Sequence, residues 1–263
     1  MHASLVDVRN LAAGYGGRAV IEALSFAVSS GQLWAVIGPN GSGKSTLLKA
    51  ITGEIGLMRG DVLVNGRRIQ DWKRQELAHF IGYLPQRINI NNFLTVREYL
   101  ELGRYFKLGP FKPLTAEDRA VIDRVVELID IFGLLDRRLL ELSMGQLQRV
   151  RFARMLVQEP QLLVVDEPLA HLDPHFEFQI MDIINSLLEK GMAVIGAFHD
   201  IELISGYATH AILLRGEEPL VGEAETVMSR EHIETAFGVE VRRCDGRIVL
   251  YPQSQPVNGG HRR

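Results

Sequence analysis

A glycine-rich loop constrains the fold of this chain more than any other part of its sequence. Residues 38–46 read Gly-Pro-Asn-Gly-Ser-Gly-Lys-Ser-Thr, which fits the phosphate-loop pattern of Gly, four residues, Gly-Lys and Ser or Thr. An apolar run at 33–37, typical of a strand covered on both faces, precedes the loop, and a segment of helical composition at 45–51 follows it. Glycines let the backbone turn its N–H groups toward a triphosphate, and a helix start favours an anion. The sequence therefore predicts a strand, loop and helix unit that binds a nucleotide.

Different residues of the loop are predicted to bind the phosphates and the metal ion. Lys44 is predicted to reach the β- and γ-phosphates, and the Ser45 hydroxyl is predicted to bind Mg²⁺. The alternative is an ordinary glycine-rich turn with a solvated lysine, which the strand and helix on either side disfavour. The predicted nucleotide-binding residues of the loop are Gly38, Pro39, Asn40, Gly41, Ser42, Gly43, Lys44, Ser45 and Thr46.

Two further apolar runs end in polar residues. The run 162–165 is followed by Asp166 and Glu167, and the run 192–198 is followed by His199. Because polar residues at the ends of buried strands meet at one edge of a sheet, we expect a site there. Asp166 is placed to hold Mg²⁺ in its outer shell, and Glu167 to polarise an attacking water. The alternative for this acidic pair alone is a turn carboxylate that caps the next helix.

Capping signals mark three helix starts between the first and second buried strands. Thr95, Thr115 and Ser143 each stand three residues before an acid or a glutamine, in a capping box or, for Thr115, in a looser relative of it. The sequence therefore predicts three helices inserted between the strands at 33–37 and 162–165.

Alternating apolar and polar residues predict strands outside this helical region. The segments 4–11 and 20–28 alternate, with a Gly-rich turn at 14–17, and predict an antiparallel opening. Further strands are predicted at 211–214 and within 240–251. No repeat, low-complexity tract or linker divides the chain.

Composition limits the classes of protein and partner. The chain has 263 residues, 46% of them hydrophobic, which is enough for a substantial core in one large domain or two small ones. The net charge of -3 and the sequence pI of about 6.3 provide no general basic field. A protein that coats nucleic acid is therefore disfavoured.

Cysteine usage and the start of the chain predict a cytosolic protein. Cys244 is the only cysteine and cannot form an internal disulfide, and the first residues lack the pattern of a signal peptide. No apolar run approaches the roughly 20 residues of a membrane-spanning helix. We therefore expect any membrane location to come through a partner. The polar segment 254–263 is predicted to be a mobile tail.

The segment 142–149, Leu-Ser-Met-Gly-Gln-Leu-Gln-Arg, narrows the prediction from a general nucleotide site to one family. It resembles the LSGGQ signature of ATP-binding cassette (ABC) proteins, and Ser143 and Gly145 stand at a predicted helix start that favours an anion. A plain capped helix is the alternative for these residues taken alone. Four further matches occur in the family's order: Tyr15 where the family stacks adenine, Gln86 as the Q-loop glutamine, Leu172-Asp173 as the end of the D-loop, and His199 as the switch histidine.

The resemblance covers about residues 6–240 and implies an α/β fold. The implied fold has a P-loop NTPase core with a mostly parallel sheet, an antiparallel β-subdomain and an inserted helical subdomain. A single ABC ATPase domain is expected over residues 1–263. Its expected parts are the core and β-subdomain at about 1–86 and 160–252, the helical subdomain at about 87–159, and the tail at about 253–263.

The resemblance also implies the cofactors ATP and Mg²⁺, and a head-to-tail homodimer that sandwiches two ATP molecules. The implied catalytic residues are Glu167, His199 and Gln86. The implied Mg²⁺ ligands are Ser45, Gln86 and Asp166. The residues implied to bind the ATP held by the other subunit are Ser143, Gly145 and Gln146.

The chain departs from the family pattern at two places. Met144 stands where the signature usually has its first glycine, which adds a side chain near the γ-phosphate. Leu169 and Ala170 replace the usual Thr and Ser of the D-loop and remove hydroxyls that bond across the dimer. ATPase activity is expected, and these substitutions are expected to affect its rate.

A free-standing cassette with a short helical insert resembles the ATPase subunit of a bacterial or archaeal importer. Within the importers, five segments resemble the subfamily that imports iron-siderophores, haem and cobalamin: 74–78, 82–86, 95–98, 103–105 and 117–119. Molybdate importers share this pattern, and zinc and manganese importers are the nearest alternative. An alternative of another class is a soluble ABC ATPase that acts on nucleic acid.

The importer resemblance implies ATP-driven alternating access. Its implied partners are integral membrane permease subunits and, indirectly, a substrate-binding protein, with no nucleic acid. The implied location is the cytoplasmic face of the membrane, reached through the permease. ATP is expected to close the dimer, and Gln86 and the helical lobe are expected to transmit this closure to the permease.

Overall fold

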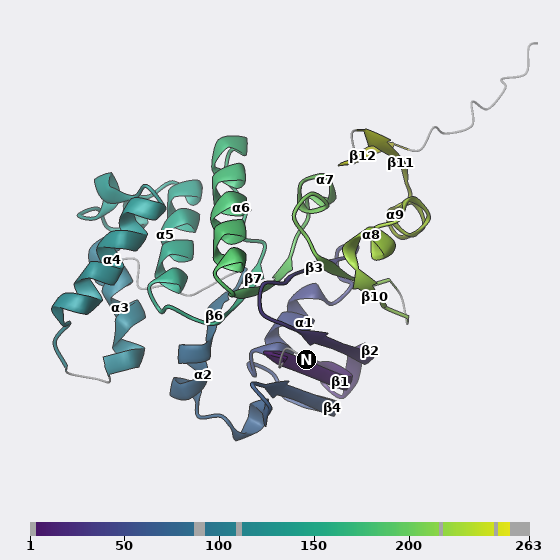
Figure 1. The fold of residues 1–263 in the computed structure, drawn as a ribbon, viewed down its shortest axis with the longest axis horizontal. Helices are drawn as coiled ribbons and strands as arrows, with labels where there is room; N and C mark the ends of the chain where they lie inside the picture. Colours follow the sequence, from purple (N-terminus) through teal and green to yellow (C-terminus); the bar gives the residue numbers. More distant parts are fainter. Residues whose placement is uncertain (1–3, 87–92, 109–111, 216–217, 245–246, 253–263) are drawn as a thin grey trace, which may run out of the picture.

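The computed structural model describes residues 4–86, 93–108, 112–215, 218–244 and 247–252 (Figure 1). Its strands are β1 (Val6–Tyr15), β2 (Arg18–Val28), β3 (Leu33–Ile37), β4 (Leu57–Val64), β5 (Arg67–Arg68), β6 (Ile81–Leu84), β7 (Leu162–Asp166), β8 (Ala193–Ala197), β9 (His210–Leu213), β10 (Leu220–Glu223), β11 (Val239–Cys244) and β12 (Arg247–Pro252). Its α-helices are α1 (Lys44–Ile51), α2 (Arg74–Phe80), α3 (Val96–Leu108), α4 (Ala116–Leu128), α5 (Met144–Leu156), α6 (Pro174–Glu189), α7 (Ile201–Ile204), α8 (Ala224–Val227) and α9 (Arg230–Phe237).

A six-stranded, mostly parallel sheet forms the centre of the molecule, in the order β10-β9-β3-β8-β7-β6. Only the edge strand β10 is antiparallel to its neighbour. Every residue of β3, β7 and β8 is buried, as the apolar runs in these strands predict, and Asp166 at the end of β7 is buried as well. The sheet confirms the predicted α/β fold class and brings the carboxyl ends of its parallel strands to one edge.

Alternate residues of β3 contribute to two hydrophobic clusters, one on each face of this sheet. Trp34 and Val36 pack with α1 and with the second sheet, whose order is β2-β1-β4-β5. Leu33, Ala35 and Ile37 pack on the other face, in the cluster that also includes residues of α3 to α6. The phosphate loop therefore lies where the antiparallel sheet, α1 and the parallel sheet meet (Figure 1).

The antiparallel opening of the chain is confirmed, with longer strands than predicted. The first strand continues past residue 11 to Tyr15, and the second begins at Arg18, so the turn consists of Gly16 and Gly17. Register shifts within the pairing of these two strands explain why the strict alternation of apolar and polar residues ended before the first strand did. The predicted strand region within 240–251 is an antiparallel hairpin of β11 and β12.

All three predicted helix starts are confirmed. Thr95, Thr115 and Ser143 each accept a hydrogen bond from the backbone N–H three residues later. The Thr115 cap is a full capping box, since the Asp118 carboxylate also accepts from the Thr115 N–H at 3.0 Å. The strands β4, β5, β6 and β10 and the helices α2 and α6 to α9 were not predicted. The expected mobile tail lies outside the described residues.

A buried arginine fixes α3 to α4 and to the end of α5. The side chains of Arg104 and Asp118 are 1% and 4% exposed and lie 2.8 Å apart. Arg104 also donates to the Val157 carbonyl at 2.7 Å and contacts Glu159 at 2.9 Å. The two buried charges therefore compensate each other within a hydrogen-bonded network.

We expect Arg104→Ala to lower the free energy of unfolding by about 3–5 kcal/mol, because it leaves the Asp118 carboxylate buried without its cation. Urea denaturation measures this loss. Arg124→Ala is the matched control, since Arg124 contacts Glu159 at 3.5 Å from a side chain that is 65% exposed. An exposed pair of this kind contributes about 0–1 kcal/mol. Equal losses in the two variants would contradict the prediction.

Candidate functional site

The phosphate loop takes its shape from glycines that no larger residue could replace. Gly38 has φ 151°, and a Cβ atom there would lie 2.4 Å from the Leu214 carbonyl oxygen. Gly43 has φ 101°, and its Cβ would lie 2.8 Å from side-chain carbons of Val20 and Ile21. The loop therefore runs close against β2 and the end of β9, while Pro39, Asn40 and Gly41 are exposed at its tip.

Lys44, the first residue of α1, is folded back onto this loop. Its Nζ donates to the Gly38 carbonyl at 2.7 Å and to the Pro39 carbonyl at 3.1 Å. Burial lowers the pKa of Lys44, and the nearby carboxylates of Glu167 and Asp166 oppose that shift. The loop therefore holds a largely buried cation against neutral carbonyl groups, a setting in which phosphate oxygens would be strong partners.

Asp166, at the carboxyl end of β7, is 2% exposed and faces α1. Burial raises its pKa, and a hydrogen bond from the Ser45 hydroxyl lowers it. Its Oδ1 atom is buried and has no hydrogen-bond partner among the described residues. A buried carboxylate oxygen without a partner, beside a hydroxyl, is the donor set that Mg²⁺ prefers. The residues present therefore fit this ion.

Three side chains predicted to act in catalysis meet at one carboxylate oxygen. Glu167 Oε1 lies 2.8 Å from Gln86 Nε2 and 2.5 Å from His199 Nε2. These residues follow the neighbouring strands β6, β7 and β8, so parallel pairing brings together positions up to 113 residues apart. Glu167 has a left-handed backbone at φ 54°, and its N–H donates to the Ala197 carbonyl at 3.1 Å. Tertiary contacts thus hold this carboxylate in an uncommon backbone conformation.

The signature residues lie at the start of α5, apart from the phosphate loop. Ser143 caps the helix in a reciprocal capping box with Gln146. A Cβ atom at Gly145 would lie 2.9 Å from the His171 carbonyl oxygen, so the glycine permits close packing on the D-loop. Met144 is 60% exposed. These four residues share a hollow of about 730 Å³ with 171–173, and no phosphate-loop residue lines it.

The remaining predicted residues have clear positions. Tyr15 ends β1 and is 50% exposed, as a residue that stacks on a ligand should be. Asp173 caps α6 through a hydrogen bond from the Phe176 N–H to its carboxylate. Thr46 is buried in α1, and the buried Ser42 hydroxyl has no partner among the described residues.

Two polar residues beside the predicted catalytic group were not predicted from the sequence. Gln148 and Arg151 line the same hollow of about 260 Å³ as Gln86 and Glu167. Their spacing of three along α5 indicated that they share one helix face. Only the structure shows that this face lies against the strand ends.

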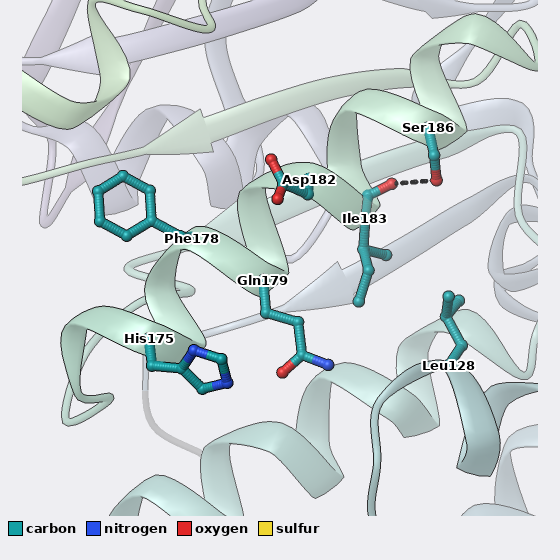
Figure 2. A pocket seen from close by; sticks show the side chains of 7 residues that line it. All are labelled: Leu128, His175, Phe178, Gln179, Asp182, Ile183 and Ser186. Carbon is teal, nitrogen blue, oxygen red and sulfur yellow. Dashed lines mark hydrogen bonds between the residues drawn. The ribbon is translucent and has the colours of Figure 1, made fainter.

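A separate hollow of about 470 Å³ runs along α6, on the face that Leu128 of α4 approaches (Figure 2). Phe178, Asp182 and Ser186 are on its α6 side, and the Ser186 hydroxyl is bonded within the helix to the Ile183 carbonyl at 2.8 Å. None of the predicted site residues lines this hollow, so we place the candidate site at the ends of β3, β6, β7 and β8 instead.

Known proteins are similar to this chain in sequence and in fold. A family profile described as ABC transporter matches residues 21–170. The hemin import ATP-binding protein HmuV of Rhizobium meliloti (strain 1021) is 34% identical over 247 residues, covering 90% of this chain and 93% of that protein. The ferric enterobactin transport ATP-binding protein FepC of Escherichia coli (strain K12) is 32% identical over 249 residues, covering 94% and 92%. The manganese transport system ATP-binding protein MntB of Listeria monocytogenes is 31% identical over 235 residues, covering 89% and 96%.

Solved structures show the same fold. An ATP-binding subunit of an ABC transporter superposes with a TM-score of 0.77 at 26% identity, covering 89% of this chain and 95% of that chain. The dimeric post-hydrolysis state of an ATP-binding cassette bound to ADP and Pi gives a TM-score of 0.74 at 26% identity, covering 83% and 98%.

Proposed function

This chain belongs to the ABC transporter family, and from that premise we propose that it hydrolyses ATP to power import through a membrane permease. The observation that carries the proposal is the convergence of Gln86 and His199 on the Glu167 carboxylate, beside the buried Asp166 and Lys44. A site of this kind combines a cation for phosphate, a carboxylate for a metal ion and a second carboxylate for water.

ATP binding is assigned to the phosphate loop and Tyr15. The Lys44 ammonium and the backbone N–H groups of the loop, which all of its residues except Pro39 have, would hold the triphosphate, with the buried Ser42 hydroxyl as a further donor. Tyr15 would stack on adenine from the end of β1, where half of its surface is free. These contacts would direct the γ-phosphate toward the carboxyl end of β7.

Ser45, Gln86 and Asp166 would hold Mg²⁺, which neutralises charge on the phosphates when it is bound. The unpartnered Asp166 Oδ1 supports this assignment. Glu167 would accept a proton from the attacking water. His199 lies 2.5 Å from the carboxylate and would keep it oriented. Gln86 follows β6 in the chain, and the segment after it leads to the helices.

Two copies of the chain would complete each site. Ser143, Gly145 and Gln146 are at a helix start that favours an anion, and they lie apart from the phosphate loop of their own chain. A head-to-tail homodimer would place these residues on the γ-phosphate of the ATP bound by the other subunit. The likeness to a dimeric cassette bound to ADP and Pi supports this arrangement.

The permease would bind outside the catalytic group and bring the chain to the cytoplasmic face of the membrane. Among the described residues, none of the helices combines the length and apolar character that a membrane crossing requires. ATP-driven closure of the dimer would move the helical part that follows Gln86, and this movement would drive alternating access.

The proposed cargo class is an iron chelate, haem, cobalamin or a related metal-containing compound. Similarity to a hemin import protein and a ferric enterobactin transport protein supports it. Zinc or manganese import is the alternative, supported by similarity to a manganese transport protein, and molybdate import is a further one. The cargo would cross the permease without touching this chain.

Reconstitution tests the proposed function. The chain would be assembled in proteoliposomes with its cognate permease, and ATP-dependent uptake would be compared for ferric siderophore, hemin, cobalamin, Mn²⁺, Zn²⁺ and molybdate. Uptake of a chelate or haem supports the proposal. Uptake of Mn²⁺, Zn²⁺ or molybdate alone would overturn the cargo class and leave the importer function intact.

We expect a photo-crosslinker at position 93 to capture the permease. Phe93 is 74% exposed and lies within residues 86–104, the segment that we expect to contact the permease if the chain is an importer subunit. Replacement of Phe93 by p-benzoylphenylalanine should give a crosslinked band with a polytopic partner after irradiation of membranes. Phe132, at 77% exposure on another part of the helical region, is the matched control and should give none. Equal capture from both positions would contradict the predicted docking segment.

A soluble ATPase that acts on nucleic acid is the alternative from another class. It predicts tight, salt-sensitive binding of DNA or RNA and no membrane partner. Fluorescence anisotropy with labelled duplex and single strands at two salt concentrations separates the two functions. The net charge of -3 favours the importer.

A further inference from the structure

The helix α5 connects two segments of the catalytic site through a pair of polar side chains. Gln148 donates from Nε2 to the main-chain carbonyls of Glu167 at 3.1 Å and Pro168 at 3.0 Å. Its Oε1 accepts a hydrogen bond of 2.9 Å from Arg151. One face of α5 is therefore tied to the end of β7.

Arg151 continues this connection to the end of β6. Its guanidinium donates to the Pro85 carbonyl and makes a longer contact of 3.5 Å with the Gln86 carbonyl. The planar fork of an arginine can reach several acceptors at once, which a lysine ammonium on a flexible stem does less well. The main chain that carries Gln86 is thus joined, through two side chains of α5, to the main chain that carries Glu167.

The side chains of Gln86 and Glu167 also bond to each other, which closes the connection into a ring. Gln86 Nε2 donates to Glu167 Oε1 at 2.8 Å, so the pair is linked once directly and once through Arg151 and Gln148. Gln148 is 5% exposed, and burial lowers the pKa of Arg151. Hydrogen bonds from a charged donor in such surroundings are strong and directional. A shift of α5 would therefore change the position of Gln86 relative to Glu167.

We infer that Arg151 and Gln148 are positioning residues, which hold Gln86 in register with Glu167 and relay movement of α5 to the catalytic carboxylate. This inference rests on the proposed ATPase function and deepens it. Both residues act through Gln86 and Glu167. This chain of hydrogen bonds begins on α5, the helix that Ser143 caps. The signature residues at the start of α5 and the Gln86–Glu167 pair are therefore connected to the same helix.

Steady-state ATPase kinetics of the full-length chain test the inference. Arg151→Ala should lower kcat by roughly 10- to 100-fold, the size expected for a small misplacement of catalytic groups, while KM for ATP stays unchanged. Equilibrium binding of a fluorescent non-hydrolysable ATP analogue should also match wild type. Arg151→Lys should recover only part of the rate, because it keeps the charge and loses the fork.

Arg154→Ala is the matched control on the same helix. Arg154 lies 5.0 Å from the Tyr99 ring, and its described contacts do not reach Gln86 or Glu167. Its loss should lower the thermal midpoint and leave kcat unchanged. If Arg151→Ala lowers kcat no more than Arg154→Ala, or lowers ATP affinity in place of kcat, the inference is overturned.

A double-mutant cycle separates positioning from a general loss of structure. In a Gln86→Ala background, Arg151→Ala should cause no further loss of kcat, because the side chain that it positions is gone. A structural role would cost the same factor in both backgrounds and would overturn the inference. Should Arg151→Ala fail to fold, Gln148→Leu takes its place in the cycle, with the same expected result. A wild-type chain without ATPase activity would refute the proposed function itself, which distinguishes the two failures.

Discussion

Lys44→Ala is expected to abolish ATP hydrolysis, with a loss of about 10³-fold or more, because the site loses its preorganised cation for the β- and γ-phosphates. In the structure the ammonium is buried and donates to the carbonyls of Gly38 and Pro39, so it is already in place before a nucleotide binds. Most of the ATP affinity should be lost as well, since the phosphates carry concentrated negative charge.

Phosphate release and equilibrium binding of a fluorescent ATP analogue measure both effects. Lys190→Ala provides the control, because Lys190 is an exposed lysine at the end of α6. The control should bind and hydrolyse ATP like wild type. Near wild-type hydrolysis by Lys44→Ala would contradict the assignment of this loop as the phosphate-binding loop.

Glu167→Gln is expected to keep ATP affinity and to lower turnover by roughly 10²-fold or more, the usual size of general-base assistance. The substituted amide keeps an oxygen where Oε1 now accepts from Gln86 and His199, so the geometry of the group should persist. What is lost is the negative charge that takes a proton from water. ATP should then persist between two subunits, and the variant should elute from size exclusion with ATP as a dimer.

The signature residue Met144 offers an internal check on that dimer. Its side chain is 60% exposed where the family usually has glycine, at the face expected to meet the other subunit. Adding Met144→Gly to Glu167→Gln should leave dimerisation unchanged or strengthen it. If only the double variant forms a dimer, the obstacle lies at Met144. Normal hydrolysis by Glu167→Gln would remove Glu167 from the catalytic role.

Local sequence determined the elements whose signals lie within a few residues. The strand, loop and helix unit at 33–51, the apolar strands β7 and β8, and the capped starts of α3, α4 and α5 are confirmed. A capping hydroxyl needs only a backbone N–H three residues away, and a strand buried on both faces needs only apolar residues. By contrast, β6 has four residues and was missed, because so short a run carries little periodic signal.

Strand-end signals pointed to Glu167 and His199, the family resemblance added Gln86, and the fold decided how the three side chains meet. Each follows a different strand, and only the order β8-β7-β6 in the sheet brings their side chains to one carboxylate oxygen. The sequence by itself determined which residues could bind a nucleotide, because that chemistry depends on residue type and on local backbone shape. Tertiary structure alone decided that Arg151 and Gln148 join two strand ends, because this depends on how α5 is rotated against the sheet, which no short stretch of sequence specifies.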